Sequence, residues 1–324
     1  MIIITVIIII LIYIFSTILI YFFIKDKFKN FTKFKSILKY NVNNETILIN
    51  KCRTDLLGSF LQSILNTILT NIEKNIIIKF DYNLINNFYD FEKQDINKLK
   101  VKNKIVKNIW ETVSSETKEE HINYRNIVLN LLFKYDINFN NNINNKKCKK
   151  INIIDAGYDL CKLSIEERTK KIDDVNFKNL TYNFRENLKK YIPNNIKTNI
   201  ISIHFRAGEI TNMSYRYIHS KEYEKLLNYL TNKFHLKIYV FTSELPSKEF
   251  DDLNTFKKYN CKILTSKECN TLQTLSIYIN SYIFIMARSS FSYVASLLRD
   301  HDNSITYYRE FWHKKPHSKI LDWY

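Results

Sequence analysis

Glycine and proline are scarce in this chain, with three of each among 324 residues. Alanine is also rare, while isoleucine, asparagine, lysine, tyrosine and phenylalanine are abundant, a bias typical of coding drift toward AT-rich codons. Runs of asparagine or lysine therefore carry little functional information. The same scarcity gives weight to a glycine that stands among charged residues, because glycine lets the backbone approach a ligand or adopt a positive φ.

Cysteine is sparse and irregularly placed. The cysteines are odd in number and scattered, so they predict neither a disulfide framework nor a cysteine-based metal site. They are Cys52, Cys148, Cys161, Cys261 and Cys269.

A recognisable nucleic-acid-binding motif is also missing, although the formal net charge is +17 and the isoelectric point about 9.4. In so lysine-rich a composition, a solvated basic surface explains this charge better than a nucleic-acid footprint. We therefore expect no nucleic-acid partner. The positive charge suits an anionic ligand without identifying it.

The N-terminus contains one long hydrophobic run. No charged side chain occurs between Ile2 and Ile24, and a helix of this length spans about 34 Å at 1.5 Å per residue. We expect a transmembrane signal anchor over residues 1–24, followed by a basic stem over 25–40. A cleaved signal peptide fits less well, because the run is longer than a typical h-region and no small-residue cleavage site follows it.

The side of the membrane on which the body lies is left open by the sequence. Lysines follow the hydrophobic run, and the positive-inside rule then favours a cytoplasmic body. Glycosylation triplets such as Asn30-Phe31-Thr32 and Asn179-Leu180-Thr181 would instead suit a lumenal body.

Two domains of ordinary size fit the remaining length. In the first, residues 41–196, the apolar spacing predicts a βαβ unit, whose strand, helix and second strand cover 45–50, 58–73 and 75–80. Gly58 lies at the first strand-to-helix turn, where it either brings the backbone close to a ligand or only makes the turn. An Asn/Lys-rich stretch at 138–150 reads as a surface insertion.

The second domain, residues 197–324, alternates strands and helices more regularly. Predicted strands cover 200–205, 236–241, 261–264, 283–286 and 304–308. Predicted helices between them cover 221–234, 271–282 and 291–299. A helix over 177–191, closed by Pro193, separates the domains. This order predicts an α/β protein with a doubly wound parallel sheet.

Polar residues gather where the predicted strands of the second domain end, and the carboxyl ends of parallel strands share one edge of a sheet. The first strand is followed by His204, Arg206, Gly208 and Glu209, the second by Thr242 and Ser243, and the fourth by Ser289, Ser290, Phe291 and Ser292. N–H groups at a helix N-terminus and a nearby arginine suit phosphate oxygens. The pattern therefore predicts a nucleotide or sugar-phosphate site.

Several of these residues also have a purely structural interpretation. Ser289 or Ser290 taken alone is more often a helix cap, and a histidine at a strand end often only braces the loop that follows. The expected position of Arg206 on the same edge favours the ligand site. Arg216, beyond the loop, adds a second positive charge.

Three segments resemble, in order and spacing, a known family. His204-Phe205-Arg206-Ala207-Gly208-Glu209 resembles the H-x-R-x-G-D motif of the fucosyltransferase superfamily that includes the α1,2-, α1,6- and protein O-fucosyltransferases. Residues 240–244 are similar to that group's strand and acidic turn, and residues 289–293 to its late S-S-F-S-W element. The clear part of the resemblance covers about residues 200–308, and Gly58 falls where the family carries a glycine-rich first loop.

The resemblance implies a GT-B fold, in which two Rossmann-like domains face a cleft, and a lumenal body. It also implies inverting, metal-independent transfer from a nucleotide-sugar donor, in most relatives GDP-fucose, with no resident cofactor. By the family pattern Arg206 contacts the donor phosphates, His204 and Gly208 shape the loop, and Ser290 with Phe291 lines the donor pocket. Glu209 is the leading candidate for the catalytic base. Without a metal, a preorganised arginine is a sufficient counter-charge for a leaving diphosphate.

We therefore expect a membrane-anchored glycosyltransferase that transfers fucose or another sugar from a GDP-sugar to a glycan or glycoprotein acceptor. The alternative is a catalytically silent glycan- or nucleotide-binding protein that keeps the fold. This alternative is motivated by Ala207 and Glu209, which depart from the family pattern.

Overall fold

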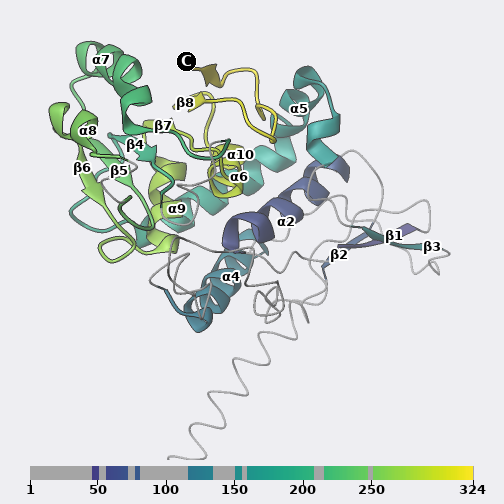
Figure 1. The fold of residues 1–324 in the computed structure, drawn as a ribbon. Helices are drawn as coiled ribbons and strands as arrows, with labels where there is room; N and C mark the ends of the chain where they lie inside the picture. Colours follow the sequence, from purple (N-terminus) through teal and green to yellow (C-terminus); the bar gives the residue numbers. More distant parts are fainter. Residues whose placement is uncertain are drawn as a thin grey trace, which may run out of the picture.

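A computed structural model of the chain describes residues 46–50, 56–71, 77–80, 116–133, 150–154, 159–207, 215–246 and 251–323. Within these ranges the protein is α/β, with two parallel sheets and surrounding helices (Figure 1). The predicted anchor, the predicted stem and residues 138–149 of the predicted insertion lie outside them, as do Gly208 and Glu209. No described helix is long and apolar enough to cross a bilayer. The membrane anchor stays a prediction.

The smaller sheet has the order β2-β1-β3 and is parallel throughout. Its strands are β1 (Thr46–Asn50), β2 (Ile77–Phe80) and β3 (Lys150–Ile154), and helix α2 (Leu57–Asn71) connects the first two. The predicted βαβ unit is confirmed, with bounds that differ by one or two residues from those expected. Strand β3 begins at the last residue of the predicted insertion.

Helices α4 (Lys118–Phe133), α5 (Ile165–Ile172) and α6 (Val175–Leu188) follow in the chain. Ser164 and Glu167 form a capping box at the start of α5, and the Asp174 carboxylate accepts two N–H groups at the start of α6. Helix α6 continues as a 3-10 turn to Tyr191, so the helix predicted over 177–191 is confirmed and starts two residues earlier. Helix α5 was not predicted.

The larger sheet has the strand order β6-β5-β4-β7-β8-β9, and every pairing in it is parallel. Its strands are β4 (Ile201–His204), β5 (Ile238–Phe241), β6 (Lys262–Leu264), β7 (Ile283–Ile285), β8 (Ile305–Tyr308) and β9 (Leu321–Asp322). The connecting helices are η8 (Ser220–Tyr223), α7 (Glu224–Lys233), α8 (Asn254–Lys258), α9 (Thr271–Asn280) and α10 (Ser290–Leu297). The predicted doubly wound parallel sheet is confirmed.

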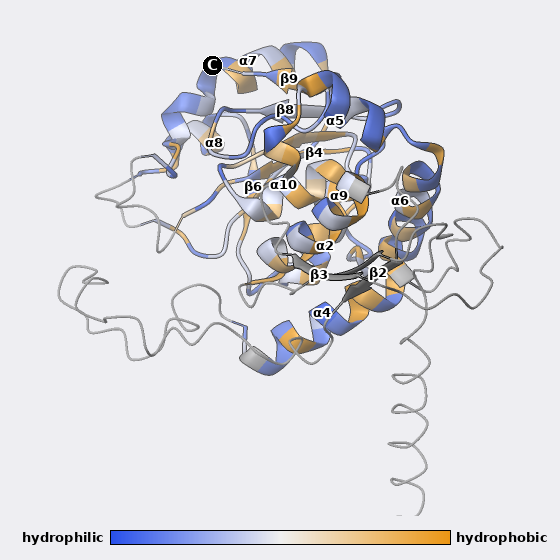
Figure 2. Cartoon of the chain, turned by 90° about the vertical axis from the view of Figure 1, so that its right-hand side faces the viewer, coloured by the Kyte–Doolittle hydropathy of each residue, from blue (hydrophilic) through white to orange (hydrophobic). Residues whose placement is uncertain are grey.

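Alternate strand residues face two hydrophobic cores on opposite sides of this sheet. Ile283 and Ile285 of β7 belong to the core under α7 and α8, whereas Phe284 belongs to the core shared with α9, α10 and α2. Burial on both faces is what parallel sheets require, and it explains why the strands read as apolar runs. Figure 2 shows hydrophobic residues concentrated on α2, α9 and α10, while α5 is mostly hydrophilic.

Helix α2 packs against α10 of the larger sheet and is almost fully buried. A Cβ atom added at Gly58 would lie 2.7 Å from the Cα and N atoms of Phe291, so only glycine permits this approach. Gly58 is therefore the second residue of the helix and a contact point between helices, rather than part of the preceding turn. Because α2 shares one core with the larger sheet, the domain boundary near residue 196 stays a prediction.

One buried arginine, Arg299, holds several backbone segments around that core together. Arg299 is fully buried and donates to the carbonyl oxygens of Tyr278, Ser281, Tyr282 and Ile305. Its Nε also donates to Thr306 Oγ1 at 2.8 Å. Burial lowers the pKa of this guanidinium to about 9, and the carbonyl groups replace the lost water.

Candidate functional site

The strand order of the larger sheet reverses at β4, whose neighbours are β5 and β7. In doubly wound sheets, ligands bind outside the carboxyl ends of the strands at such a reversal. Arg206 lies two residues beyond β4, Thr242 directly follows β5, and Ser289 stands four residues beyond β7. The common edge predicted from the sequence is confirmed, and the ligand roles of its residues stay predictions.

His204 joins the end of β4 to α10. Its Nδ1 atom lies 2.6 Å from Ser292 Oγ, and the same oxygen accepts the Ala287 N–H at 3.0 Å. The ring stacks on Tyr278, with centroids 5.3 Å apart, and meets the edge of Phe291 at 6.0 Å. Burial, together with the Arg206 charge, lowers the pKa of His204 to about 3. His204 is thus a neutral brace between two strand ends.

The serines of the 289–292 element are engaged in the fold. Ser289 caps α10, because its Oγ accepts the Phe291 N–H at 3.2 Å. Ser290 Oγ lies 3.1 Å from Nε2 of the fully buried His313. The structural interpretation therefore accounts for the observed contacts of Ser289, Ser290 and Ser292. Phe291 packs against His204 through its ring and against Gly58 through its backbone.

His313 connects α10 to two earlier parts of the chain. Its Nδ1 atom lies 3.4 Å from Gln62 Nε2 of α2 and 3.9 Å from Cys161 Sγ. The ring stacks on Tyr293, with centroids 4.7 Å apart. From the sequence, the aromatic segment 311–316 that contains His313 either lines an acceptor cleft or only packs, and nothing in its spacing indicated these partners.

The residues after β5 close their own turn. Thr242 Oγ1 donates to the Glu244 carbonyl at 2.6 Å, and Ser243 accepts the Ser266 hydroxyl through its backbone carbonyl at 3.0 Å. Neither of these contacts presents a side chain to a ligand. Arg206 lies two residues beyond β4 and carries a charge suited to phosphate, and its side chain is half-buried.

Two further arginines belong to the same edge. Arg288 directly precedes Ser289, and it donates through Nε to the Glu310 carbonyl at 3.0 Å and through Nη1 to the Tyr215 carbonyl at 3.1 Å. The guanidinium of Arg216 lies over the Trp312 ring, 4.7 Å from its centroid. Arg288 follows the same predicted strand as the serine element, but the sequence prediction gave it no donor-binding role. With Arg206, these residues make the edge strongly basic.

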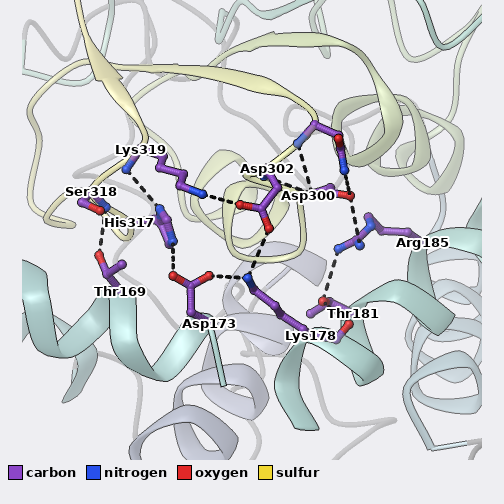
Figure 3. Close-up of polar contacts among 11 residues, drawn as sticks. Thr169, Asp173, Lys178, Thr181, Arg185, Asp300, Asp302, His317, Ser318 and Lys319 are labelled. Carbon is purple, nitrogen blue, oxygen red and sulfur yellow. Dashed lines mark hydrogen bonds and ion pairs between the residues drawn. The ribbon is translucent and has the colours of Figure 1, made fainter. Parts of the chain in front are cut away.

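A charged cluster joins α5 and α6 to the C-terminal segment (Figure 3). Asp302 accepts Lys178 Nζ at 3.2 Å and also Lys319, while Asp300 lies 3.8 Å from Arg185. The contacts with Lys319 and Lys178 lower the pKa of Asp302 to about 2. Each carboxylate thus faces a cation, and the cluster holds the C-terminal segment against α6.

The same cluster corrects one reading of the sequence. Asp300-His301-Asp302 has D-x-D spacing, so the interpretation that the chain lacks a D-x-D motif, which supported the expected metal independence, is wrong. In the described ranges, no group of three or more acidic, histidine or cysteine side chains is arranged to hold a metal ion. Metal independence stays a prediction.

Comparison with known proteins gives weak likenesses. No protein-family model and no curated protein matches the chain. Among solved structures, POFUT1 in its apo form is 9% identical with a TM-score of 0.39, over 82% of this chain and 98% of that one. Heptosyltransferase WaaC of E. coli, with ADP-2-deoxy-2-fluoro heptose, is 8% identical with a TM-score of 0.37, over 86% and 92%. POFUT1 in complex with GDP-fucose is 9% identical with a TM-score of 0.35, over 80% and 96%.

At these identities and TM-scores, the likenesses establish neither a family nor an activity for this chain. The fold and the edge themselves define an α/β protein with a basic region at the strand-order reversal of a doubly wound sheet.

Proposed function

We propose that the protein is a glycosyltransferase that moves a sugar from a nucleotide-sugar donor, with a GDP-sugar the first choice, to a hydroxyl of a glycan or glycoprotein acceptor. The observation that carries the proposal is the position of Arg206 and the α10 N-terminus on the two sides of the strand-order reversal. The resemblance of residues 204–209 and 289–293 to fucosyltransferase motifs supports the same function.

The geometry suits the departure of a diphosphate. In an inverting transfer the acceptor oxygen attacks the anomeric carbon, the bond to the diphosphate oxygen breaks, and a base takes the hydroxyl proton. In this proposal the negative charge that grows on the diphosphate is balanced by the Arg206 guanidinium and by the positive N-terminal end of the α10 dipole, although the Phe291 N–H of α10 is already held by Ser289. Such a preorganised counter-charge is worth several orders of magnitude in rate. Glu209, outside the described residues, is the proposed base.

His204 and Ser292 support this arrangement without touching the substrate. Their hydrogen bond ties the loop that carries Arg206 to the helix whose N-terminus faces the diphosphate. Catalysis depends on the relative position of the two positive elements, so this tie is a positioning contact. Membrane attachment through residues 2–24 is part of the proposal, and the side on which the body lies is left open.

The experiment is calorimetric titration of the full-length protein in mild detergent with GDP, UDP, CMP and GDP-fucose, with EDTA present. We expect GDP-selective binding that is lost in Arg206→Ala, and turnover lowered by about two orders of magnitude in the same variant. Lys197→Ala, an exposed cation just before the other end of β4, is the matched control and should bind normally. A folded protein that binds no nucleotide would overturn the proposal.

A catalytically silent binding protein is the second candidate. The observation that favours it is the engagement of Ser289, Ser290 and Ser292 with the fold rather than with an open site. Turnover of any nucleotide sugar by the wild-type protein would exclude it.

A further inference from the structure

The rim of this edge carries an exposed aromatic pair. Tyr215 is 64% exposed, which makes it the most exposed large aromatic side chain in the part of the chain that the structure describes. Its ring centroid lies 6.3 Å from that of Trp312, and the two ring planes are inclined by 66°. Exposure of this kind is unfavourable for a large apolar ring, and such residues often mark a binding surface.

Two arginines, Arg288 and Arg216, hold this aromatic pair in place. Arg288 hydrogen-bonds the Tyr215 and Glu310 carbonyls with one guanidinium, so the two segments that carry the aromatic rings are tied together. Arg216 covers one face of the Trp312 ring at 4.7 Å, and the Phe311 ring contacts its edge with centroids 5.0 Å apart. The rings are therefore held in place before any ligand arrives, which reduces the entropy cost of binding.

The pair also lies beside the proposed donor site. Arg288 stands between β7 and Ser289, the cap of α10, so its hydrogen bond to Tyr215 brings that residue next to the strand-order reversal. A group that stacks on Tyr215 thus lies close to a sugar carried by a diphosphate at this edge. An acceptor has to occupy this place for transfer to occur.

We propose that Tyr215 and Trp312 form a carbohydrate-binding platform on which a sugar ring of the acceptor stacks. The platform thereby favours an oligosaccharide acceptor over a bare polypeptide. That the bound sugar is an acceptor rests on the proposed function. A pyranose ring presents its axial C–H groups to an aromatic face and its hydroxyls outward. This matches Tyr215, an amphipathic side chain that is exposed to solvent. A nucleobase also stacks on aromatic rings, so the test compares the effect of Tyr215→Ala on sugar binding with its effect on GDP binding.

The test is saturation-transfer NMR on the full-length protein in mild detergent, with N-acetyllactosamine, chitotriose and maltotriose as probes. At least one probe should receive saturation at its ring protons, and Tyr215→Ala should weaken that binding at least tenfold, while Tyr215→Phe keeps most of it. Tyr182→Ala, which removes a 56% exposed tyrosine from α6, is the matched control and should change nothing. Trp312→Ala should also weaken binding, and Tyr215→Ala keeps the test decisive if that variant does not fold.

Three results would overturn the platform: no saturation of any probe, binding that survives Tyr215→Ala, or an equal tenfold loss of GDP binding in Tyr215→Ala, which would make it a nucleobase site. Nucleotide titration of the wild-type protein separates the two proposals. GDP binding without oligosaccharide binding refutes the platform and leaves the glycosyltransferase standing. Oligosaccharide binding that needs Tyr215, without any nucleotide binding, supports the platform and refutes the glycosyltransferase.

Discussion

The imidazole of His204 and the hydroxyl of Ser292 lie 2.6 Å apart, and this contact joins the two strand ends that flank the strand-order reversal. The Ser292 oxygen also accepts the Ala287 N–H, so its own proton is available to Nδ1, and the ring proton then resides on Nε2. One hydroxyl thus satisfies a backbone donor and sets the tautomer of the neighbouring imidazole.

Replacing that hydroxyl tests its role. Ser292→Ala leaves the Ala287 N–H and His204 Nδ1 without their shared partner, and we expect the free energy of unfolding to fall by about 2 kcal/mol. Urea denaturation measures the change. Ser243→Ala is the control, because Ser243 contacts Ser266 through its backbone carbonyl, which this substitution keeps. Equal stability of the two variants would contradict the assignment.

The close contact of α2 with α10 predicts that one methyl group added at Gly58 lowers the stability of the fold strongly. In Gly58→Ala the new Cβ atom meets backbone atoms of Phe291 at 2.7 Å, and backbone cannot move aside as a side chain can. We expect a loss of about 2 kcal/mol, seen as a lower melting temperature. Ser59→Ala, at the next and half-buried position, should stay near wild type. A Gly58→Ala variant with unchanged melting temperature would show that the two helices do not approach this closely.

His301 predicts a pH dependence of stability. Burial and the neighbouring His317, on which its ring stacks at 4.3 Å, lower the pKa of His301 to about 3. Between about pH 6 and pH 4 the unfolded chain binds a proton at this residue that the folded chain does not, so stability falls as the pH falls. His301→Gln should make this decline shallower by up to about 1.4 kcal/mol per pH unit. Urea denaturation at several pH values gives the two slopes, and parallel slopes would refute the prediction.

Arg299 is expected to be the most sensitive cation of the fold. Arg299→Met leaves several buried carbonyl groups without a donor, and we expect it to cost about 3 kcal/mol or more. Lys233→Met removes an exposed cation at the end of α7 and should cost little. Circular dichroism during thermal unfolding compares the two. A near-native Arg299→Met variant would mean that water can replace the guanidinium.

The architecture of the second half could be read from the sequence because its strands are buried on both faces. Each is a short apolar run that ends in polar residues, and the five predicted strands from 200–205 to 304–308 all lie where expected. Helix α5 was missed although Ser164 and Glu167 form a capping box, because its eight residues contain few apolar positions. Helix α8 and strand β9 were missed because they span only five and two residues.

The sequence predicted only part of the candidate site. That Arg206 and the α10 N-terminus meet at one edge follows from topology, which the alternation of strands and helices predicts. The contacts of Ser290 with His313 and of Gly58 with Phe291 join segments that are distant in the sequence. No local sequence pattern predicts such contacts. The sequence offered residues 311–316 as a possible lining of an acceptor cleft, but the pairing of Trp312 with Tyr215 was not predicted, because the two become neighbours only when β8 lies beside β7.

The place of His313 has a consequence for how the protein is made. Its ring contacts residues that precede it by 251, 152 and 23 positions. While the ribosome is still adding the last strands, α2 has long been released, but α10 and His313, which cover one side of it, are made last. One side of this apolar helix is thus uncovered for most of translation. Chaperones that hold such segments should associate with the nascent chain until residue 313 emerges.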